Sequence, residues 1–435
     1  MALGGGSFTV QNKELPGAYI NFVSAASASP ELSDRGIATM PLELDWGREN
    51  EVFEVTNEDF QKDCKKIFGY DFNDEKIKGL RDLFLGANVL YAYRLNSGGQ
   101  KAENELATAL YGGVRGNDLS ITIQANADVP SKFDVKTYLG LLEVDVQTVG
   151  SAAELKPNDY VTFHEDAELA ASASSPLSGG ENGVVDGEAH RAYLNKIESY
   201  TYNVMGVAVT DDTTKKLYAA FNKRLRDEMG IKFQLVVYDM AADYMGVINV
   251  KNQVSDEGWS EAGLVYWVTG AECACPVNKS CQNKRYDGCF TVDVDFTQNQ
   301  LRQSVKSGEF VLHRVNSDIR VLEDINSMVT FTGECKEVFK DNQTVRVIDQ
   351  LGNSDAVLFN TKYLGTVPNN ESGRISLWSD LVKIRQALQD MGAIENFSDS
   401  DVVVGTGETK KSVVVSGSIM VVNAMSKVYM TVTVA

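Results

Sequence analysis

The chain has 435 residues, 43% of them hydrophobic, and its 41 Lys and Arg residues stand against 60 Asp and Glu residues, a formal charge of −19. This length allows about two to four domains whose cores need no disulfides, and the hydrophobic content excludes extended disorder. The negative charge disfavours binding to nucleic acid or anionic lipid, because no segment rich in Lys and Arg offsets it.

The N-terminal stretch "MALGGGSFTVQNKELPG" has neither the charged start nor the apolar run of a secretory signal. No segment approaches the roughly 18 uninterrupted apolar residues of a spanning helix, so we expect no membrane insertion. The six cysteines are too few for a disulfide scaffold of this size. We therefore expect free thiols and folding in a reducing cytoplasm.

Residues 1–24 predict an N-terminal extended arm, because a β-prone stretch after a Gly-rich tether needs a sheet elsewhere. Residues 25–95 predict an α/β part of the core. Its elements are expected to be a strand at 36–44, a helix at 57–70 capped by Asn57, a helix at 75–85 and a strand at 87–95.

Residues 96–185 change to short alternating strands, about six or seven, and predict an all-β insertion domain on the outer surface. The low-complexity stretch "ELAASASSPLSGGENG" is expected to be a loop that closes this domain.

Residues 186–345 return to an α/β pattern. Its elements are expected to be a strand at 202–209, a helix at 211–230 with an Asp cap and Gly230 after its end, a strand at 232–239 parallel to the first, a helix at 257–274 and paired strands within 309–331.

Residues 346–435 predict a C-terminal inner domain. A helix over 375–394 places Leu377, Leu381, Ile384 and Leu388 on one face, and 401–435 follows as strand, turn, strand, strand. The predicted fold class is multidomain α+β or α/β, with mixed-sheet core domains, an all-β insertion and extended β-strand arms at both termini.

Four cysteines, Cys273, Cys275, Cys281 and Cys289, are spaced C-x-C-x5-C-x7-C. Structural zinc sites usually use C-x2-C pairs, whereas C-x-C in an extended segment points its side chains to opposite faces. No histidine lies nearby. Buried or incidental thiols are therefore the favoured interpretation, and a metal site or a disulfide is the weaker alternative.

Catalytic motifs are missing from the sequence. The glycines of "YGGVRGNDL" fit neither a P-loop nor a dinucleotide fingerprint, and His164, His190 and His313 belong to no recognisable catalytic motif. We expect no enzymatic activity and no cofactor.

Several segments together resemble the tail sheath proteins of contractile phages and phage-tail-like particles of Gram-positive bacteria. They are "LPGAYINFVSA", "RGIATMPLELDWG", "LFLGANVLYAYRLNSGGQKA", "YGGVRGNDLSITI", "GGENG", "AGLVYWVTGAECACPVNKSCQNKRYDG", "VLHRVNSDIRVLEDINSMVTFT", "NQTVRVIDQL" and "SGSIMVVNAMSKVYMTVTV". Their order and spacing cover nearly the whole chain. Similar proteins carry small or apolar residues at the positions of Cys273, Cys275 and Cys281, which supports the interpretation as incidental thiols.

The resemblance implies a structural subunit that polymerises as a helical array of hexameric rings around a tail tube and contracts to drive the tube through a bacterial envelope. Its implied partners are other copies of itself, the tail tube protein, and baseplate and tail terminator proteins. The implied location is the bacterial host cytoplasm during assembly, and then a virion tail or a released tail-like particle.

The resemblance also implies that both terminal strands are exchanged between subunits by β-augmentation. The expected N-terminal anchors are Phe8, Val10, Tyr19, Ile20 and Phe22, and the expected C-terminal anchors are Val428, Tyr429, Met430 and Val432. Deleting residues 1–24 is expected to abolish polymers and leave a folded monomer.

By analogy with the family, the exposed face of the helix at 376–391 is the expected contact with the tube, through Lys383 and Arg385; an ordinary covering helix is the alternative. Two rival classes remain for the chain as a whole. One is a metal- or thiol-dependent enzyme or binding module built on the cysteine loop, and the other is a different self-assembling shell protein.

Overall fold

The computed structural model describes residues 35–333 and 335–434. These residues form two compact units: a large unit of residues 35–350 with 421–434, and a small unit of residues 351–420. The predicted N-terminal arm, with Phe8, Val10, Tyr19, Ile20 and Phe22, lies outside the described residues.

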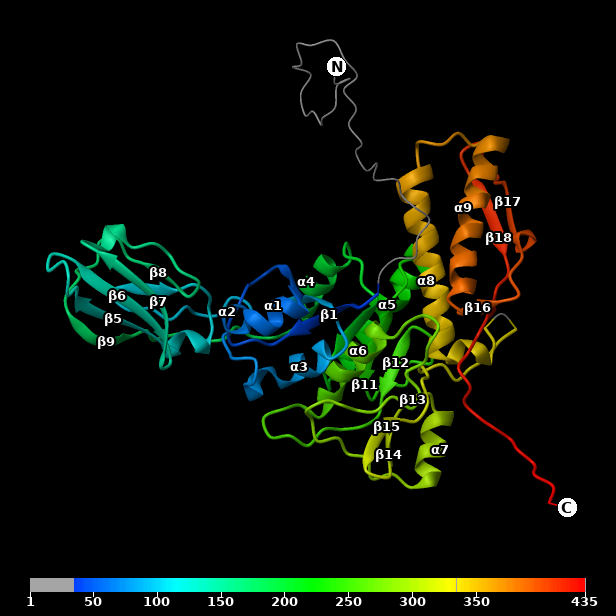
Figure 1. Ribbon diagram of the computed structural model, residues 1–435, viewed down its shortest axis with the longest axis horizontal. Coiled ribbons are helices and arrows are strands. Elements are labelled where there is room, and N and C mark those ends of the chain that lie inside the picture. The colour runs from blue at the N-terminus through cyan, green and yellow to red at the C-terminus, as the bar shows by residue number, and fades with distance from the viewer. Residues whose placement is uncertain (1–34, 334, 435) are drawn as a thin grey trace, which may run out of the picture. The chain divides into compact units, whose positions relative to one another are not determined.

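A seven-stranded sheet forms the centre of the large unit (Figure 1). Its strands, in spatial order, are β13 (Glu309–Phe310), β12 (Val247–Val250), β11 (Gln234–Tyr238), β10 (Val204–Val207), β1 (Ile37–Leu42), β3 (Val89–Arg94) and β2 (Val52–Thr56). All neighbouring pairs are parallel except β2 and β3, so the sheet is mixed as predicted. The predicted parallel pairing of β10 with β11 is confirmed.

Helices pack on the sheet around two separate apolar cores, each with its own buried aromatic residues. The helical segments of this unit are α1 (Asn57–Lys62), α2 (Cys64–Phe68), η1 (Glu75–Ile77), α3 (Lys78–Phe84), α4 (Gly187–Ile197), α5 (Asp212–Arg224), η4 (Leu225–Met229), η5 (Glu261–Gly263), α6 (Leu264–Ala274), α7 (Gln298–Lys306) and η6 (Glu337–Lys340). Helix α6 is the predicted apolar helix, and Gly230 ends η4 at a left-handed φ of 77° as expected.

The predicted helix at 57–70 differs from the structure at its start and in its middle. Thr56, not Asn57, is the cap. Its hydroxyl accepts a hydrogen bond from the backbone N–H of Asp59, and the Asp59 carboxylate accepts one from the backbone N–H of Thr56. The helix then breaks at Asp63, so two short helices replace one.

The segment between residues 107 and 176 holds six strands, in agreement with the predicted all-β domain (Figure 1). The sheets are β4 (Ala107–Ala109) with β8 (Val161–Phe163), and β7 (Leu142–Val149), β6 (Phe133–Leu139), β5 (Leu119–Ala125) and β9 (Ser172–Pro176), with the short helices η2 (Val114–Asp118) and η3 (Ala152–Glu154) between them. One expectation is wrong: "SASSP" is strand β9, not loop. Its backbone pairs with β5, and such pairing does not need apolar side chains.

The hairpin of β14 (Leu312–Val315) and β15 (Asp318–Val321) is the predicted pair of strands. The long helix α8 (Asn342–Leu358) follows, with its first residues in the large unit and residues 351–358 in the small unit. No helix among the described residues is long and apolar enough to cross a membrane.

The small unit is built around α9 (Glu371–Asp390), on which Leu377, Leu381, Ile384 and Leu388 are buried as predicted. Its other elements are η7 (Phe359–Tyr363), β16 (Ile394–Glu395), η8 (Asp399–Asp401), β17 (Val402–Thr406) and β18 (Val413–Gly417). The two-residue strand β19 (Met420–Val421) is the third strand of the tail, and residues 422–434, which include the expected strand arm at 427–434, have no regular secondary structure.

Candidate assembly surfaces

Within the described part of the chain, the hydrogen bonds of the last residues to the large unit lie at the root of the tail. The side chain of Gln343 donates to the carbonyl of Val422 at 3.0 Å and accepts the backbone N–H of Ala424 at 2.9 Å. Gln282 donates to the hydroxyl of Ser426 at 2.9 Å. We call residues 427–434, which follow this root, the C-terminal segment.

The C-terminal segment is apolar and exposed. The expected anchors lie here, with Val428, Tyr429, Met430 and Val432 between 71% and 91% exposed. In a strand, alternate side chains share a face. Val428, Met430 and Val432 would then form one apolar face, and Tyr429 would lie on the other face with Lys427 and the threonines.

The hairpin of β17 and β18 is a second exposed apolar surface. It is a two-stranded sheet with five residue pairs, from Val402 with Gly417 to Thr406 with Val413. Val402 is buried against α9, where the indole N–H of Trp378 donates to its carbonyl at 3.0 Å. Val403 and Val414 are more than half exposed.

A shallow groove runs beside β17, between the strand and α9. It is lined by Glu371, Arg374, Ile375, Trp378, Val402, Val403 and Val404. Among the described residues β17 pairs with β18 alone, so one edge of β17 has no neighbouring strand.

Arg385 does not lie on the exposed face of α9, which corrects that part of the expected tube contact. Its side chain is 9% exposed and binds Asp355 through two hydrogen bonds of 2.5 and 2.6 Å. Lys383 is more than half exposed and lies 3.3 Å from Asp380. Of the two residues, only Lys383 presents its charge to solvent; the position of the tube contact stays a prediction.

Because Arg385 is buried and Lys383 is exposed, we expect their replacement to have unequal effects on the stability of the fold. Arg385→Gln is expected to lower the free energy of unfolding by about 2–3 kcal/mol, because it leaves the half-buried Asp355 carboxylate without its partner. Lys383→Gln is expected to cost less than about 0.5 kcal/mol. Urea denaturation of both variants measures the effects, and equal losses would contradict the buried ion pair.

The four cysteines of the loop do not converge on one point. Cys273, Cys275 and Cys281 are buried and Cys289 is exposed, and all are free thiols. Cys273 lies in α6, within the helix expected at 257–274, and Cys275 caps the end of α6, so the extended geometry considered for a C-x-C pair does not apply. Cys289 lies away from the others, with its backbone N–H bound to Asp82 at 2.7 Å.

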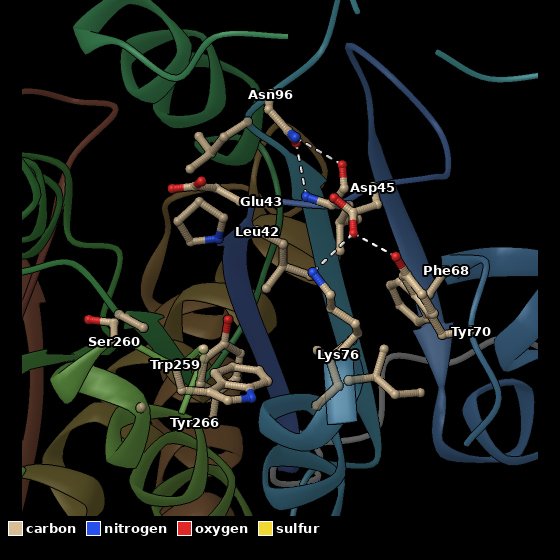
Figure 2. A pocket seen from close by; sticks show the side chains of 18 of the residues that line it. Leu42, Glu43, Asp45, Phe68, Tyr70, Lys76, Asn96, Trp259, Ser260 and Tyr266 are labelled. Atoms are coloured by element: carbon tan, nitrogen blue, oxygen red, sulfur yellow. Dashed lines mark hydrogen bonds and ion pairs between the residues drawn. The ribbon is translucent and has the colours of Figure 1, made fainter. Parts of the chain in front are cut away.

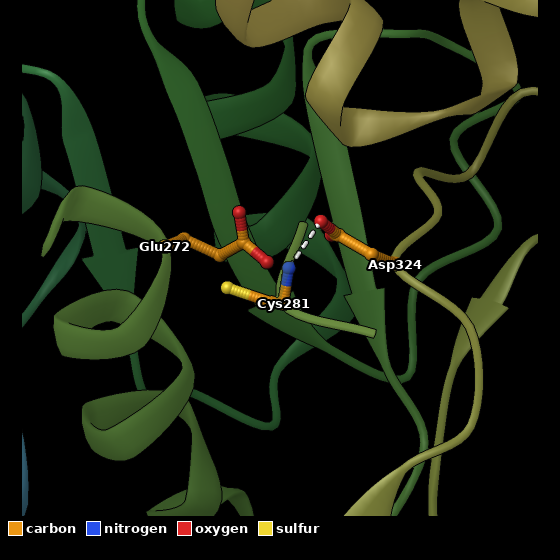
Figure 3. Close-up of side chains that lie close together, drawn as sticks. All are labelled: Glu272, Cys281 and Asp324. Atoms are coloured by element: carbon orange, nitrogen blue, oxygen red, sulfur yellow. Dashed lines mark hydrogen bonds between the residues drawn. The ribbon is translucent and has the colours of Figure 1, made fainter. Parts of the chain in front are cut away.

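A different set of groups meets beside this loop: ligand atoms of Glu272, Cys281 and Asp324 lie within 4.8 Å of one another (Figure 3). The buried guanidinium of Arg346 lies 2.6 Å from the Glu272 carboxylate and 3.3 Å from that of Asp324. We call Glu272, Asp324 and Arg346 the buried ion cluster.

The charges of the buried ion cluster are already balanced by arginine. Burial raises the pKa of Glu272 well above its usual range. At Asp324 burial also acts to raise the pKa, but Arg346 together with hydrogen bonds from Glu272, Asn342 and the Cys281 backbone outweighs it and lowers the pKa. A divalent cation here would face the Arg346 guanidinium at close range, and repulsion would oppose its binding. The cluster therefore acts as a structural ion pair rather than as a metal site.

The large unit also has a pocket of about 400 Å³ at the carboxyl ends of β1, β3 and β10, where open α/β sheets often bind ligands (Figure 2). Several of its polar groups bind one another. Asp45 accepts from Tyr70 at 2.6 Å and Asn182 at 2.8 Å and lies 3.5 Å from Lys76, while Asn96 binds the backbone of Leu44. None of the chain's three histidines lines it.

Comparisons with known proteins account for nearly the whole chain. Residues 35–95 match the family described as tail sheath protein Gp18 domain III N-terminal region, 97–182 the phage tail sheath protein beta-sandwich domain, 183–327 the phage tail sheath protein central domain and 334–435 the phage tail sheath C-terminal domain.

Similar individual proteins agree with these matches. The phage-like element PBSX protein XkdK of Bacillus subtilis is 32% identical, with 99% of this chain and all of that protein covered. The crystal structure of a sheath tail protein from Desulfitobacterium hafniense is 34% identical, with a TM-score of 0.79 over 90% of this chain and 93% of that chain. The contracted helical sheath of the anti-feeding prophage shares the fold, with a TM-score of 0.56 at 13% identity over 97% and 99% of the two chains.

Proposed function

Because the chain belongs to the phage tail sheath protein family, and is thus a structural, non-enzymatic component of a phage or phage-like tail, we propose that it polymerises around a tail tube and contracts to drive the tube through a bacterial envelope. The observation that carries this proposal is the exposed apolar C-terminal segment. An apolar strand without a sheet is a liability unless another chain covers it.

The C-terminal segment is the donor in this proposal. Its backbone supplies hydrogen bonds to the sheet of another copy, and the face with Val428, Met430 and Val432 sets the register. Attachment at Gln343 and Gln282 fixes where the segment leaves its own subunit, while residues 427–434 remain available for pairing.

The hairpin of β17 and β18 is the acceptor. The groove beside β17 offers a strand edge together with the apolar surface of Ile375 and Trp378. An incoming strand would extend the two-stranded sheet and cover the exposed Val403. Isolated two-stranded hairpins are marginal in water, so the added strand would also stabilise the acceptor.

In the assembled tail, head-to-tail contacts of this kind do not close and give a helical array of hexameric rings. The N-terminal arm is proposed as a second exchanged strand, Lys383 on α9 as a tube contact, and the ends of the array as the contacts to baseplate and terminator proteins. Contraction then releases a kinetically trapped extended state and needs no nucleotide.

Cross-linking between two differently tagged copies tests the exchange. One copy carries Met430→Cys and the other Val403→Cys, both in a Cys289→Ser and Cys335→Ser background, and a short bis-maleimide joins nearby thiols. We expect cross-linked dimers that contain both tags, together with sheath-like tubes in electron micrographs of the untreated protein.

A single chain that carries both Met430→Cys and Val403→Cys tests whether the C-terminal segment pairs with the hairpin of its own subunit. If it yields cross-linked monomers only, the C-terminal segment pairs with its own hairpin and the proposed exchange is wrong. Thr433→Cys in place of Met430→Cys is the matched control, because its side chain lies on the opposite face of the proposed strand and should cross-link less.

A further inference from the structure

The first described residue, Arg35, is held at the end of helix α6. Its guanidinium donates to the carbonyl of Glu272 at 3.2 Å and to that of Cys275 at 3.1 Å. These carbonyls belong to the last turn of α6 and to its cap, where helix carbonyls have no partner within the helix. A cation is also favoured at this end of a helix. Arg35 therefore fixes the start of the described chain to the end of α6.

Asp324 holds both residues that precede the supports of the C-terminal root. Its Oδ2 atom accepts the backbone N–H of Cys281 at 2.8 Å (Figure 3), and the next residue, Gln282, binds the root. Its Oδ1 atom accepts from the side chain of Asn342 at 2.9 Å, and the next residue, Gln343, binds the root. One buried carboxylate thus positions both attachments of the C-terminal segment.

The buried ion cluster joins these two anchor points. Arg346 donates to the Glu272 carboxylate at 2.6 Å and to the Asp324 carboxylate at 3.3 Å. Glu272 is also the residue whose backbone carbonyl binds Arg35. The three members of the cluster are at most 3% exposed, and hydrogen bonds shielded from water are stronger than exposed ones. A continuous series of hydrogen bonds therefore runs from Arg35 through the cluster to the root.

We propose that the buried ion cluster couples the two ends of the described chain, so that release of Arg35 from α6 loosens the root of the C-terminal segment, and the reverse. The use of this coupling rests on the proposed function. If both ends pair with other copies, a pull on one end reaches the other through the same subunit. Coupling in free energy is reciprocal, so each end affects the other by the same factor.

Loss of Arg35 acts first on the end of α6. The last carbonyls of the helix lose their donor, and helix ends without such partners fray. The Glu272 side chain then moves with the last turn and holds Arg346 less firmly. Arg346 also donates to the carbonyl of Lys279 at 2.7 Å, in the loop that leads to Gln282. Fraying of α6 therefore reaches the loop that supports the root.

Hydrogen exchange measured by mass spectrometry tests the coupling in monomers of the full chain, isolated by gel filtration. With Arg35→Gln, peptides from the last turn of α6 and peptides that contain Ala424 should both exchange faster. Ala424 reports on the root, because its backbone N–H is bound by Gln343. We expect exchange at the root to become roughly 2- to 30-fold faster.

The reverse experiment loosens the root and observes α6. The double variant Gln282→Ala with Gln343→Ala removes the side chains that bind the root. Exchange in the last turn of α6 should become faster by a similar factor, although neither glutamine contacts Arg35 in the described hydrogen bonds. This measurement also decides the question if Arg35→Gln does not fold.

Arg48→Gln is the matched control, because Arg48 forms a solvent-exposed pair with Glu51. It should leave exchange at the root unchanged, and strands β5 and β6 should exchange as in the parent chain in every variant. The proposal is overturned if Arg35→Gln loosens α6 and not the root, if the reverse variant leaves α6 unchanged, or if all peptides accelerate alike. Failure of the proposed function would instead appear in the cross-linking of two copies, since monomers exchange no strand.

Discussion

Two aspartates on the apolar face of the C-terminal segment, Val428→Asp with Val432→Asp, are expected to abolish polymers and leave a folded subunit. Both valines are more than 70% exposed in the subunit, so the subunit loses no packing. In the proposed strand their faces are buried, and each lost valine costs about 1.5–3 kcal/mol before the cost of burying a carboxylate. Together the two substitutions are expected to weaken each strand contact between subunits by at least about 10²- to 10⁴-fold.

Pelleting by ultracentrifugation and electron microscopy measure polymer formation, and thermal unfolding reports on the subunit. The matched control is Thr431→Asp with Thr433→Asp, which adds the same charge to the opposite face. We expect the control to lose at most a few-fold in polymer yield. Tubes of normal length from the Val428 and Val432 variant would show that the segment does not pair through this face.

Local patterns predicted most elements of the fold correctly. The apolar run of β3 and the spacing of Leu377, Leu381, Ile384 and Leu388 on α9 depend on neighbours within one element, and the structure buries them as expected. The same reasoning failed for "SASSP", since strand β9 exists because of its backbone pairing with β5, more than forty residues earlier in the chain.

Side-chain roles that depend on distant partners could not be predicted. Arg385 was expected at the surface because nothing near it in sequence indicates Asp355, 30 positions earlier on α8. The buried ion cluster joins α6, the stretch after β15 and α8, and its members are 22 to 74 positions from Arg346. No local sequence pattern distinguishes Glu272, Asp324 or Arg346 from other charged residues of the chain.

The buried ion cluster yields the largest expected effect on stability. Arg346→Met should lower the free energy of unfolding by about 3–5 kcal/mol at pH 7, because the fully buried carboxylates of Glu272 and Asp324 lose their shared partner. The lost hydrogen bond to Lys279 adds to this. Arg191→Met, which breaks a solvent-exposed pair with Glu188, is the control and should cost less than about 0.5 kcal/mol.

The loss in the Arg346→Met variant should depend on pH with a defined sign. In the parent chain burial already raises the pKa of Glu272, and Arg346 helps to hold that of Asp324 down. Without the guanidinium, we expect the folded-state pKa of both carboxyl groups to rise further above the parent values, so the folded variant binds protons more readily than the folded parent chain. Its stability then rises as the pH falls through the folded pKa values, and the gap to the parent chain narrows. Urea denaturation between pH 5 and pH 8 measures this gap.

A second substitution that also removes the Glu272 carboxylate distinguishes two causes of the stability loss, the broken ion pairs and a simple loss of packing. In the double variant Glu272→Gln with Arg346→Met, one unpaired carboxylate is gone, whereas Asp324 keeps its bonds from Asn342 and the Cys281 backbone. We expect the double variant to recover about half of the lost free energy or more. If it is less stable than Arg346→Met alone, the loss comes from packing rather than from an uncompensated charge, and the electrostatic account of the cluster is wrong.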